Sequence, residues 1–324
     1  MNMESQNMIA PIPQSPENIL RQIYRSLGMI PFILILLIIV LGIINPRFFT
    51  LSNAIIVTRQ ACFLALVSMG QMLVILTKGV DVSLGAIIGI CSVVAAIVAK
   101  EFGAVAGWFT PMVIGGAVGL LNGAVVAYAK IDSFAVTLGT LSISHGLALI
   151  ISNGLTIYNL PPAYKSLALA KPFGLPLPII ITAVVLGLMY LIMHRMRFGR
   201  YVYAAGGNQE ALRLSGVNVN TVMLWVFGGA GILTGISAAL LSTRINSGQP
   251  NLGAALMLES IAACVVGGVT FKGGVGSIIG VMFGVLFLAT LSNGFDMVGV
   301  SSFVKQVVVG SIIIVAVIID KFKK

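Results

Sequence analysis

The feature that most constrains this chain is a succession of apolar runs, most of them long enough to cross a bilayer, separated by short polar links. A helix needs about 20 apolar residues to span the hydrocarbon core. Only 9% of the 324 residues are charged, whereas soluble proteins carry roughly 25%. The sequence therefore predicts an all-α polytopic membrane protein with about ten transmembrane helices, over residues 28–45, 55–77, 83–99, 104–128, 133–152, 176–193, 221–243, 254–270, 275–293 and 302–319.

The basic residues predict how these helices are oriented. If the N-terminus is cytoplasmic, 12 of the 19 Lys and Arg residues lie on the cytoplasmic side: Arg21, Arg25, Lys78, Lys130, Arg195, Arg197, Arg200, Arg213, Lys272, Lys321, Lys323 and Lys324. This bias follows the positive-inside rule and places both termini in the cytoplasm. Residues 1–27 are then a polar cytoplasmic leader, and residues 28–324 form the transmembrane domain. The net charge of +10 is interpreted as orienting helices in lipid, so no nucleic-acid partner is expected.

The two halves of the chain share landmarks in the same order. Residues 79–86 resemble residues 248–254, and the glycine series 115, 119, 123 is matched by 276, 280, 284. Asn122-Gly123 then corresponds to Asn293-Gly294, and Ser133-Phe134 to Ser302-Phe303. This pairs spans 2–5 with spans 7–10, and an offset of five spans requires the copies to be inverted, as in many transporters. Chance similarity between glycine-rich helices, whose small residues favour close helix packing, is the alternative.

Several types of chemistry are absent from the sequence. No GxxxxGK[ST] phosphate loop occurs, and the nearest basic glycine cluster, at residues 270–274, has the wrong spacing. Cys62, Cys91 and Cys264 lie within apolar runs and are expected to be small buried residues. The two histidines, His145 and His194, are far apart in sequence and have no evident metal partner. We expect no catalytic residues, no metal site and no cofactor bound by this chain itself.

Five polar residues within the apolar region are candidates for a hydrated solute path: Gln71, Asp81, Asn122, Glu259 and Asn293. A charged side chain costs roughly 2.5–3.5 kcal/mol at the centre of a membrane helix, so Asp81 and Glu259 need partners or water. A structural role in hydrogen bonding is the alternative for both. Asp81 is placed to cap the helix that begins near Ser83.

The longest predicted cytoplasmic loop, about residues 194–220, contains a short helix of about two turns. Asn208 is a suitable N-cap, Glu210 suits the positive end of the helix dipole, and Gly216 is a suitable stop. Such a capped, partly apolar helix either docks into a groove of a partner or lies on the membrane surface.

The same loop carries a resemblance to a known family. Gly199-Arg200-Tyr201, Gly206-Gly207-Asn208, Ala211 and residues 215–219 resemble the coupling loop of ribose-type ABC transporter permeases. Residues 79–85, 261–263, 267–268, 293–294 and 299–302 add to the resemblance, which covers the chain from about Asn45 onward.

The resemblance implies a bacterial cytoplasmic (inner) membrane protein that imports a monosaccharide, ribose or a related sugar. It implies a second permease subunit, most simply as a homodimer, a cytoplasmic ABC ATPase that hydrolyses ATP, and a periplasmic or extracellular sugar-binding protein. The residues expected to contact the ATPase are Gly206, Gly207, Asn208, Glu210, Ala211, Leu214, Ser215 and Gly216. The alternative is an ion-gradient-driven secondary transporter, against which the spans lack a chain of acidic residues.

Overall fold

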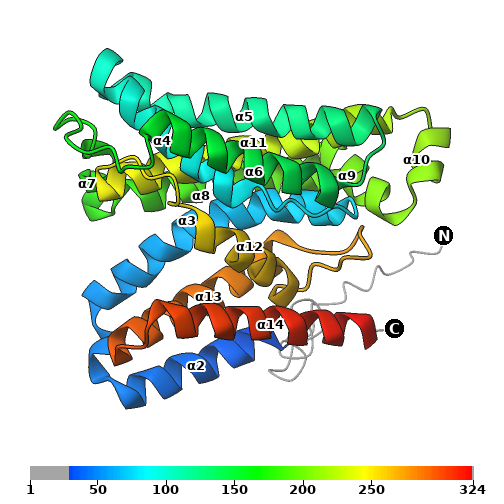
Figure 1. The fold of residues 1–324 in the computed structure, drawn as a ribbon. Helices are drawn as coiled ribbons and strands as arrows, with labels where there is room; N and C mark the ends of the chain where they lie inside the picture. Colours follow the sequence, from blue (N-terminus) through cyan, green and yellow to red (C-terminus); the bar gives the residue numbers. More distant parts are fainter. Residues whose placement is uncertain (1–28, 323–324) are drawn as a thin grey trace, which may run out of the picture.

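The computed structural model describes residues 29–322, and every predicted span contains a helix (Figure 1). The predicted leader, residues 1–27, lies outside the described residues. The matching helices are α2 (Ile30–Ile44), α3 (Leu51–Leu76), α4 (Leu84–Phe102), α5 (Ala104–Tyr128), α6 (Ser133–Ser152), α8 (Leu177–Arg195), α11 (Val219–Ile245), α12 (Ala254–Val266), α13 (Ile278–Val298) and α14 (Ser302–Phe322).

Short elements fill the connections. A 3-10 turn, η1 (Pro46–Phe49), joins α2 to α3, and α7 (Ser166–Leu169) and η2 (Pro172–Gly174) lie between α6 and α8. Two further helices, α9 (Arg197–Gly207) and α10 (Gln209–Leu214), connect α8 to α11.

Seven helices in the described part of the chain are long and apolar enough to cross a membrane: α3, α4, α5, α6, α8, α11 and α13. The apolar parts of α2, α12 and α14 are shorter. The predicted span 254–270 is too long at its C-terminal end, because Gly267 caps α12 and Gly268 has a φ of +85°. The chain is therefore an all-α polytopic membrane protein, as predicted.

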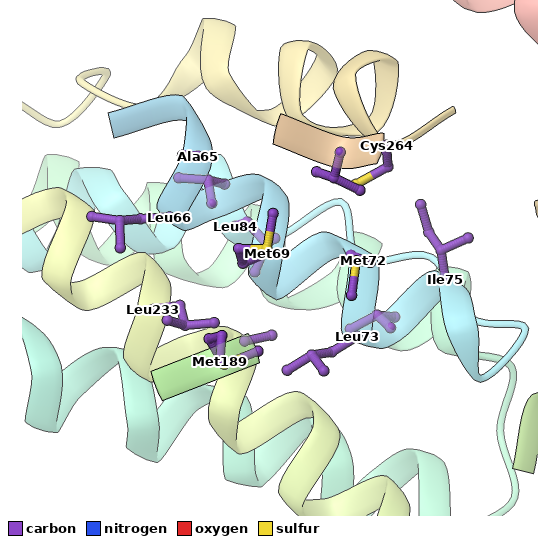
Figure 2. Packing of buried hydrophobic residues seen from close by; sticks show 14 of the residues in the cluster. Ala65, Leu66, Met69, Met72, Leu73, Ile75, Leu84, Met189, Leu233 and Cys264 are labelled. Atoms are coloured by element: carbon purple, nitrogen blue, oxygen red, sulfur yellow. The ribbon is translucent and has the colours of Figure 1, made fainter. Parts of the chain in front are cut away.

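Helix α3 forms the centre of the molecule, with α2, α13 and α14 on one side of it and α4, α5, α6 and α11 on the other (Figure 1). Every residue of α3 from Ala61 to Leu76 is buried. Figure 2 shows Met69, Met72 and Leu73 of α3 in the same cluster as side chains of neighbouring helices: Leu84, Met189, Leu233 and Cys264. All three cysteines are buried and free, as predicted.

The glycine series pack helices closely against each other. A β-carbon at Gly115 would overlap the carbonyl oxygen of Gly231, and one at Gly119 would overlap that of Phe227. As the residue number rises along α5 it falls along α11, so the two helices are antiparallel. In the second half, a β-carbon at Gly284 would overlap the carbonyl oxygen of Ala263. Small residues thus let backbones touch, which is how helices associate in lipid.

Two non-helical links, residues 79–83 and 247–253, precede α4 and α12. The first link follows the start of α6: the Val80 N–H donates to Ser133 Oγ at 3.0 Å, and the Val82 N–H to Thr137 Oγ1 at 3.2 Å. The second follows α4 backwards, since the Gln249 N–H donates to Ser92 Oγ at 3.0 Å. It ends where a β-carbon at Gly85 would lie 2.7 Å from the Gly253 oxygen.

One end of the bundle gathers the segments that the basic residues predict to be cytoplasmic. The Gly274 N–H donates to the carbonyl oxygen of Leu76 at 2.8 Å, beside Lys78. Gly206, near the end of α9, packs against both Leu76 and Gly274. In Figure 1 the C-terminal end of α14 lies toward the same side as α10. These segments therefore share one end of the molecule.

Candidate functional site

Helix α10 projects from this end and is built as the sequence predicts. Asn208 caps it, because its Oδ1 accepts a hydrogen bond from the Ala211 N–H at 3.0 Å. Glu210 lies in the first turn, where the helix dipole favours a negative charge. Gly216, with a φ of +80°, follows the last turn. The predicted two-turn helix is confirmed.

The sequence did not predict α9, which precedes α10. Gly199, Gly206 and Gly207 disfavour a helix by propensity, and the segment is rich in arginine. Tertiary packing overrides this, since Val202 and Ala205 are buried against the core while Arg197 and Arg200 are exposed. The Tyr203 hydroxyl also donates to the Gly276 carbonyl oxygen at 3.0 Å. Helix α9 thus attaches α10 to the bundle.

The neighbouring glycines Gly206 and Gly207 have different environments. A β-carbon at Gly206 would overlap the carbonyl oxygen of Leu76, whereas one at Gly207 would meet nothing within 4 Å. Gly206 is therefore a buried packing residue at the root of α10. The other residues of the predicted contact set are all exposed: Gly207, Asn208, Glu210, Ala211, Leu214, Ser215 and Gly216.

The exposed face of α10 combines a charge pair with an apolar side chain. Arg213 Nη2 lies 2.6 Å from Glu210 Oε1, and this neighbouring guanidinium lowers the pKa of Glu210. Leu214 is 77% exposed, whereas Leu212 is buried beneath the helix. The exposed Leu214 and the charge pair therefore form a compact docking surface on a helix that the buried Leu212 anchors to the bundle.

Two of the five predicted path residues lie in one buried hydrogen-bond network. Asp81 Oδ1 accepts from the N–H and the hydroxyl of Ser83, at 2.8 and 2.5 Å. Asn122 Nδ2 donates to Ser83 Oγ at 3.1 Å, and Thr140 Oγ1 donates to Asn122 Oδ1 at 2.6 Å. Asp81 thus lies at the span junction, as predicted. It does not cap α4, because Ser83 is the N-cap residue and the Asp81 carboxylate accepts from the N–H of Ser83 itself. Ser83 and Thr140 were not predicted as partners of these residues, because the fold brings together α4 and α6, which are distant in sequence.

The other three path residues lie elsewhere. Asn293 Nδ2 donates to Asn53 Oδ1 at 2.9 Å, near the start of α3. Gln71 is fully buried in α3, and neither atom of its amide has a partner among the described residues. Glu259 is half-buried in α12 and interacts electrostatically with Lys305 of α14. The five residues therefore do not form a single site.

A bundle of apolar helices with buried polar groups and a helix exposed at one end has the architecture of a membrane transport protein. A model of the family described as "branched-chain amino acid transport system / permease component" matches residues 53–317. The ribose import permease protein RbsC of Escherichia coli (strain K12) is 33% identical over 296 residues, which cover 90% of this chain and 92% of that protein.

Two further relatives agree with this match. RbsC of Bacillus subtilis (strain 168) is 35% identical over 305 residues, covering 93% of this chain and 94% of the relative. The D-allose transport system permease protein AlsC of Escherichia coli (strain K12) is 32% identical over 293 residues, covering 90% of each. No solved structure matches the chain. The chain belongs to this family of transport permeases, and within it to the ribose-type ABC permeases.

Proposed function

We propose that this chain is the membrane-spanning permease subunit of an ATP-driven ABC importer for a monosaccharide, ribose or a related sugar. The observation that carries the proposal is the match over about nine tenths of the chain to permeases named for ribose and D-allose transport. The exposed, capped helix α10 supports it, because a docking helix has no evident purpose in a transporter driven by an ion gradient.

The proposed architecture has ten membrane crossings, both termini in the cytoplasm of a bacterium, and an inverted repeat. Antiparallel contact of α3 with α11 supports inversion, since Ser237 Oγ donates to the Phe63 oxygen while Gly70 packs on Ala230. The repeat is also consistent with α6 and α14 beginning at Ser133 and Ser302. A non-helical link precedes both α4 and α12.

The proposed partners are a second permease subunit, most simply a second copy of this chain, a cytoplasmic ABC ATPase and a sugar-binding protein outside the cytoplasmic membrane. ATP is hydrolysed by the ATPase, and this chain contributes no catalytic residue or cofactor. Gly207, Asn208, Glu210, Ala211, Leu214, Ser215 and Gly216 are proposed to touch the ATPase. Gly206 supports this contact from beneath, because it packs against Leu76.

The proposed solute path passes between buried polar groups of the helices. Asp81 and Asn122 share a hydrogen-bond network, and Gln71 keeps an unpartnered amide among the described residues. Glu259 and Asn293 remain proposed path residues at greater distance from this network. A path built from separated polar groups suits a cargo that must be released as readily as it is bound.

Reconstitution tests the function directly. The permease is purified with its partner ATPase and sugar-binding protein, and uptake of radiolabelled D-ribose, D-allose and L-arabinose is measured in proteoliposomes. We expect uptake only with internal ATP, external binding protein and all subunits present. Accumulation by the isolated chain under a proton or sodium gradient would instead establish the secondary transporter.

A matched glycine pair tests the role of α10. A β-carbon added at Gly207 would meet no described residue within 4 Å, so in Gly207→Leu the fold and melting temperature should be unchanged while ATP-driven uptake is lost. Gly206→Leu would collide with the Leu76 backbone and should lower the melting temperature itself. Normal uptake by the Gly207→Leu transporter would show that α10 does not dock on the ATPase.

A further inference from the structure

A groove of about 170 Å³ lies where α4, α6 and α12 approach each other. Gly85 and Ala86 at the start of α4, Leu141 and His145 of α6, and Asn251 and Met257 from the second link and α12 line it. Three segments that are distant in sequence thus form one surface. It is separate from the predicted path residues Gln71, Glu259 and Asn293.

The groove lies deep in the membrane region. His145 is 12 residues beyond Ser133, the first residue of α6, which is about 18 Å along a helix. The hydrocarbon core is about 30 Å thick, so His145 lies near its middle. Asn251 is exposed and His145 half-buried at this depth. Polar side chains do not face lipid there without a large cost, so the groove must face water or another protein surface.

Two helices begin at this groove. A non-helical link leads into each helix, and α4 and α12 start where Gly85 meets Gly253. The first backbone hydrogen bond of α4 is donated by the Ile87 N–H to the Ser83 oxygen at 2.9 Å. The N–H groups of Gly85 and Ala86, both in the lining, make none with the described residues. Unpaired N–H groups at helix starts are donors for electronegative ligand atoms.

A side-chain pair supplies further polar groups. His145 Nε2 donates to Asn251 Oδ1 at 2.7 Å. The other ring nitrogen of His145 and the amide nitrogen of Asn251 make no hydrogen bond with the described residues. The second ring nitrogen of His145 is thus left as an acceptor, and the amide nitrogen of Asn251 is left as a donor with two hydrogens. Leu141 and Met257 provide apolar surface beside them.

We propose that this groove is a monosaccharide-binding site on the translocation path. The N–H groups of Gly85 and Ala86 and the Asn251 amide donate to sugar hydroxyl oxygens, and a sugar hydroxyl donates to His145. The C–H face of the sugar ring packs on Leu141 and Met257. This inference rests on the proposed function, and it adds solute contacts next to the buried network of Asp81 and Asn122, because Thr140 of that network directly precedes Leu141 of the groove lining.

Cysteine labelling tests whether the groove is wet and occupied by sugar. Ala254 is an exposed residue of the lining, and the native cysteines are all buried, so Ala254→Cys gives a single reactive thiol. It should react with a charged methanethiosulfonate, and D-ribose, D-allose or L-arabinose should slow the reaction by the factor 1 + [L]/Kd. Leu188→Cys, on an exposed apolar position of α8, is the control and should show neither effect.

Uptake by the complete transporter tests the same residues. His145→Leu and Asn251→Leu should each reduce sugar uptake about tenfold, the loss expected for a hydrogen bond to the cargo. Three quantities should not change: the melting temperature, the ATPase rate measured with the binding protein present, and the affinity of the binding protein for sugar. The preference of the transporter among the three sugars should change. His194→Leu, far along the chain in α8, should leave uptake unchanged.

The outcomes separate the two proposals. Full uptake with unchanged sugar preference in both variants, or labelling that none of the three sugars slows, overturns the groove as a sugar site. The permease function stands in that case if wild-type uptake requires ATP. Uptake by the wild type without the ATPase overturns the proposed function instead. The labelling needs no ATP and therefore still decides the groove.

Discussion

The two halves of the membrane domain have the same order of elements but are held together differently. In the first half, residues 79–83 are fastened by side chains of that same half, since Ser133 and Thr137 accept hydrogen bonds from Val80 and Val82. In the second half, residues 247–253 are fastened to the first half. Ser92 of α4 binds Gln249, and Gly248 exchanges two backbone hydrogen bonds with Ile157, at 2.9 and 3.0 Å.

This difference shows that corresponding residues in the two halves do not make corresponding contacts. Asn122 joins two partners, Ser83 and Thr140, while its counterpart Asn293 joins one, Asn53. The link of the first half is therefore held by residues of that half, whereas the link of the second half is held by residues of the first half. The expected consequences of substitutions differ accordingly.

The largest effect is expected at the joint between the halves. Gly115→Leu places a side chain where the Gly231 carbonyl already lies. Overpacking costs 1–3 kcal/mol where neighbours can move, and because this neighbour is backbone in a packed helix we expect a loss of at least about 3 kcal/mol. Detergent-solubilised protein should show little folded monodisperse species by fluorescence-detected size exclusion.

The control is Gly187→Leu in α8, where an added β-carbon meets nothing within 4 Å. It should express and melt like the wild type. Equal behaviour of the two variants would mean that the backbone contact between α5 and α11 does not hold the halves together.

Much of the fold is readable from the sequence because lipid imposes a minimum apolar length on each crossing. All ten predicted ranges contain helices, and α10 was located by Asn208, Glu210 and Gly216. Local chemistry could not reveal what depends on distant partners. Helix α9 forms because the core accepts Val202 and Ala205. The pairing of His145 with Asn251 joins residues 106 positions apart, and no periodicity encodes it.

The next largest effect compares the paired asparagines. Asn122→Leu leaves the hydroxyls of Ser83 and Thr140 without their buried partner, and two hydrogen bonds at 0.5–1.5 kcal/mol each amount to about 2 kcal/mol. Asn293→Leu removes one bond, and Asn293 Oδ1 already has no partner among the described residues, so about 1 kcal/mol or less is expected. Thermal unfolding in detergent measures both. A larger loss of stability for Asn293→Leu than for Asn122→Leu would show that the second half, not the first, is held more firmly by its asparagine.

The smallest effect tests whether the second link opens alone. Ser92→Ala removes the hydroxyl that accepts from the Gln249 N–H. The one hydroxyl hydrogen is shared between the Gln249 oxygen and the Gly89 oxygen of its own helix, so about one hydrogen bond to the link is lost, at a cost of about 1 kcal/mol. Hydrogen exchange should then quicken in residues 247–253. Residues 79–83 should stay protected, because their partners Ser133 and Thr137 belong to α6.

Thr110→Ala is the matched control, since among the described residues its hydroxyl bonds to Ala106 of its own helix alone, and it should change exchange in neither link. If Ser92→Ala quickened exchange in residues 79–83 as well, the two links would open as one unit. The first half would then not hold its link independently. In that case the meeting of Gly85 with Gly253 would be the element that couples the halves, because it is where the two links touch.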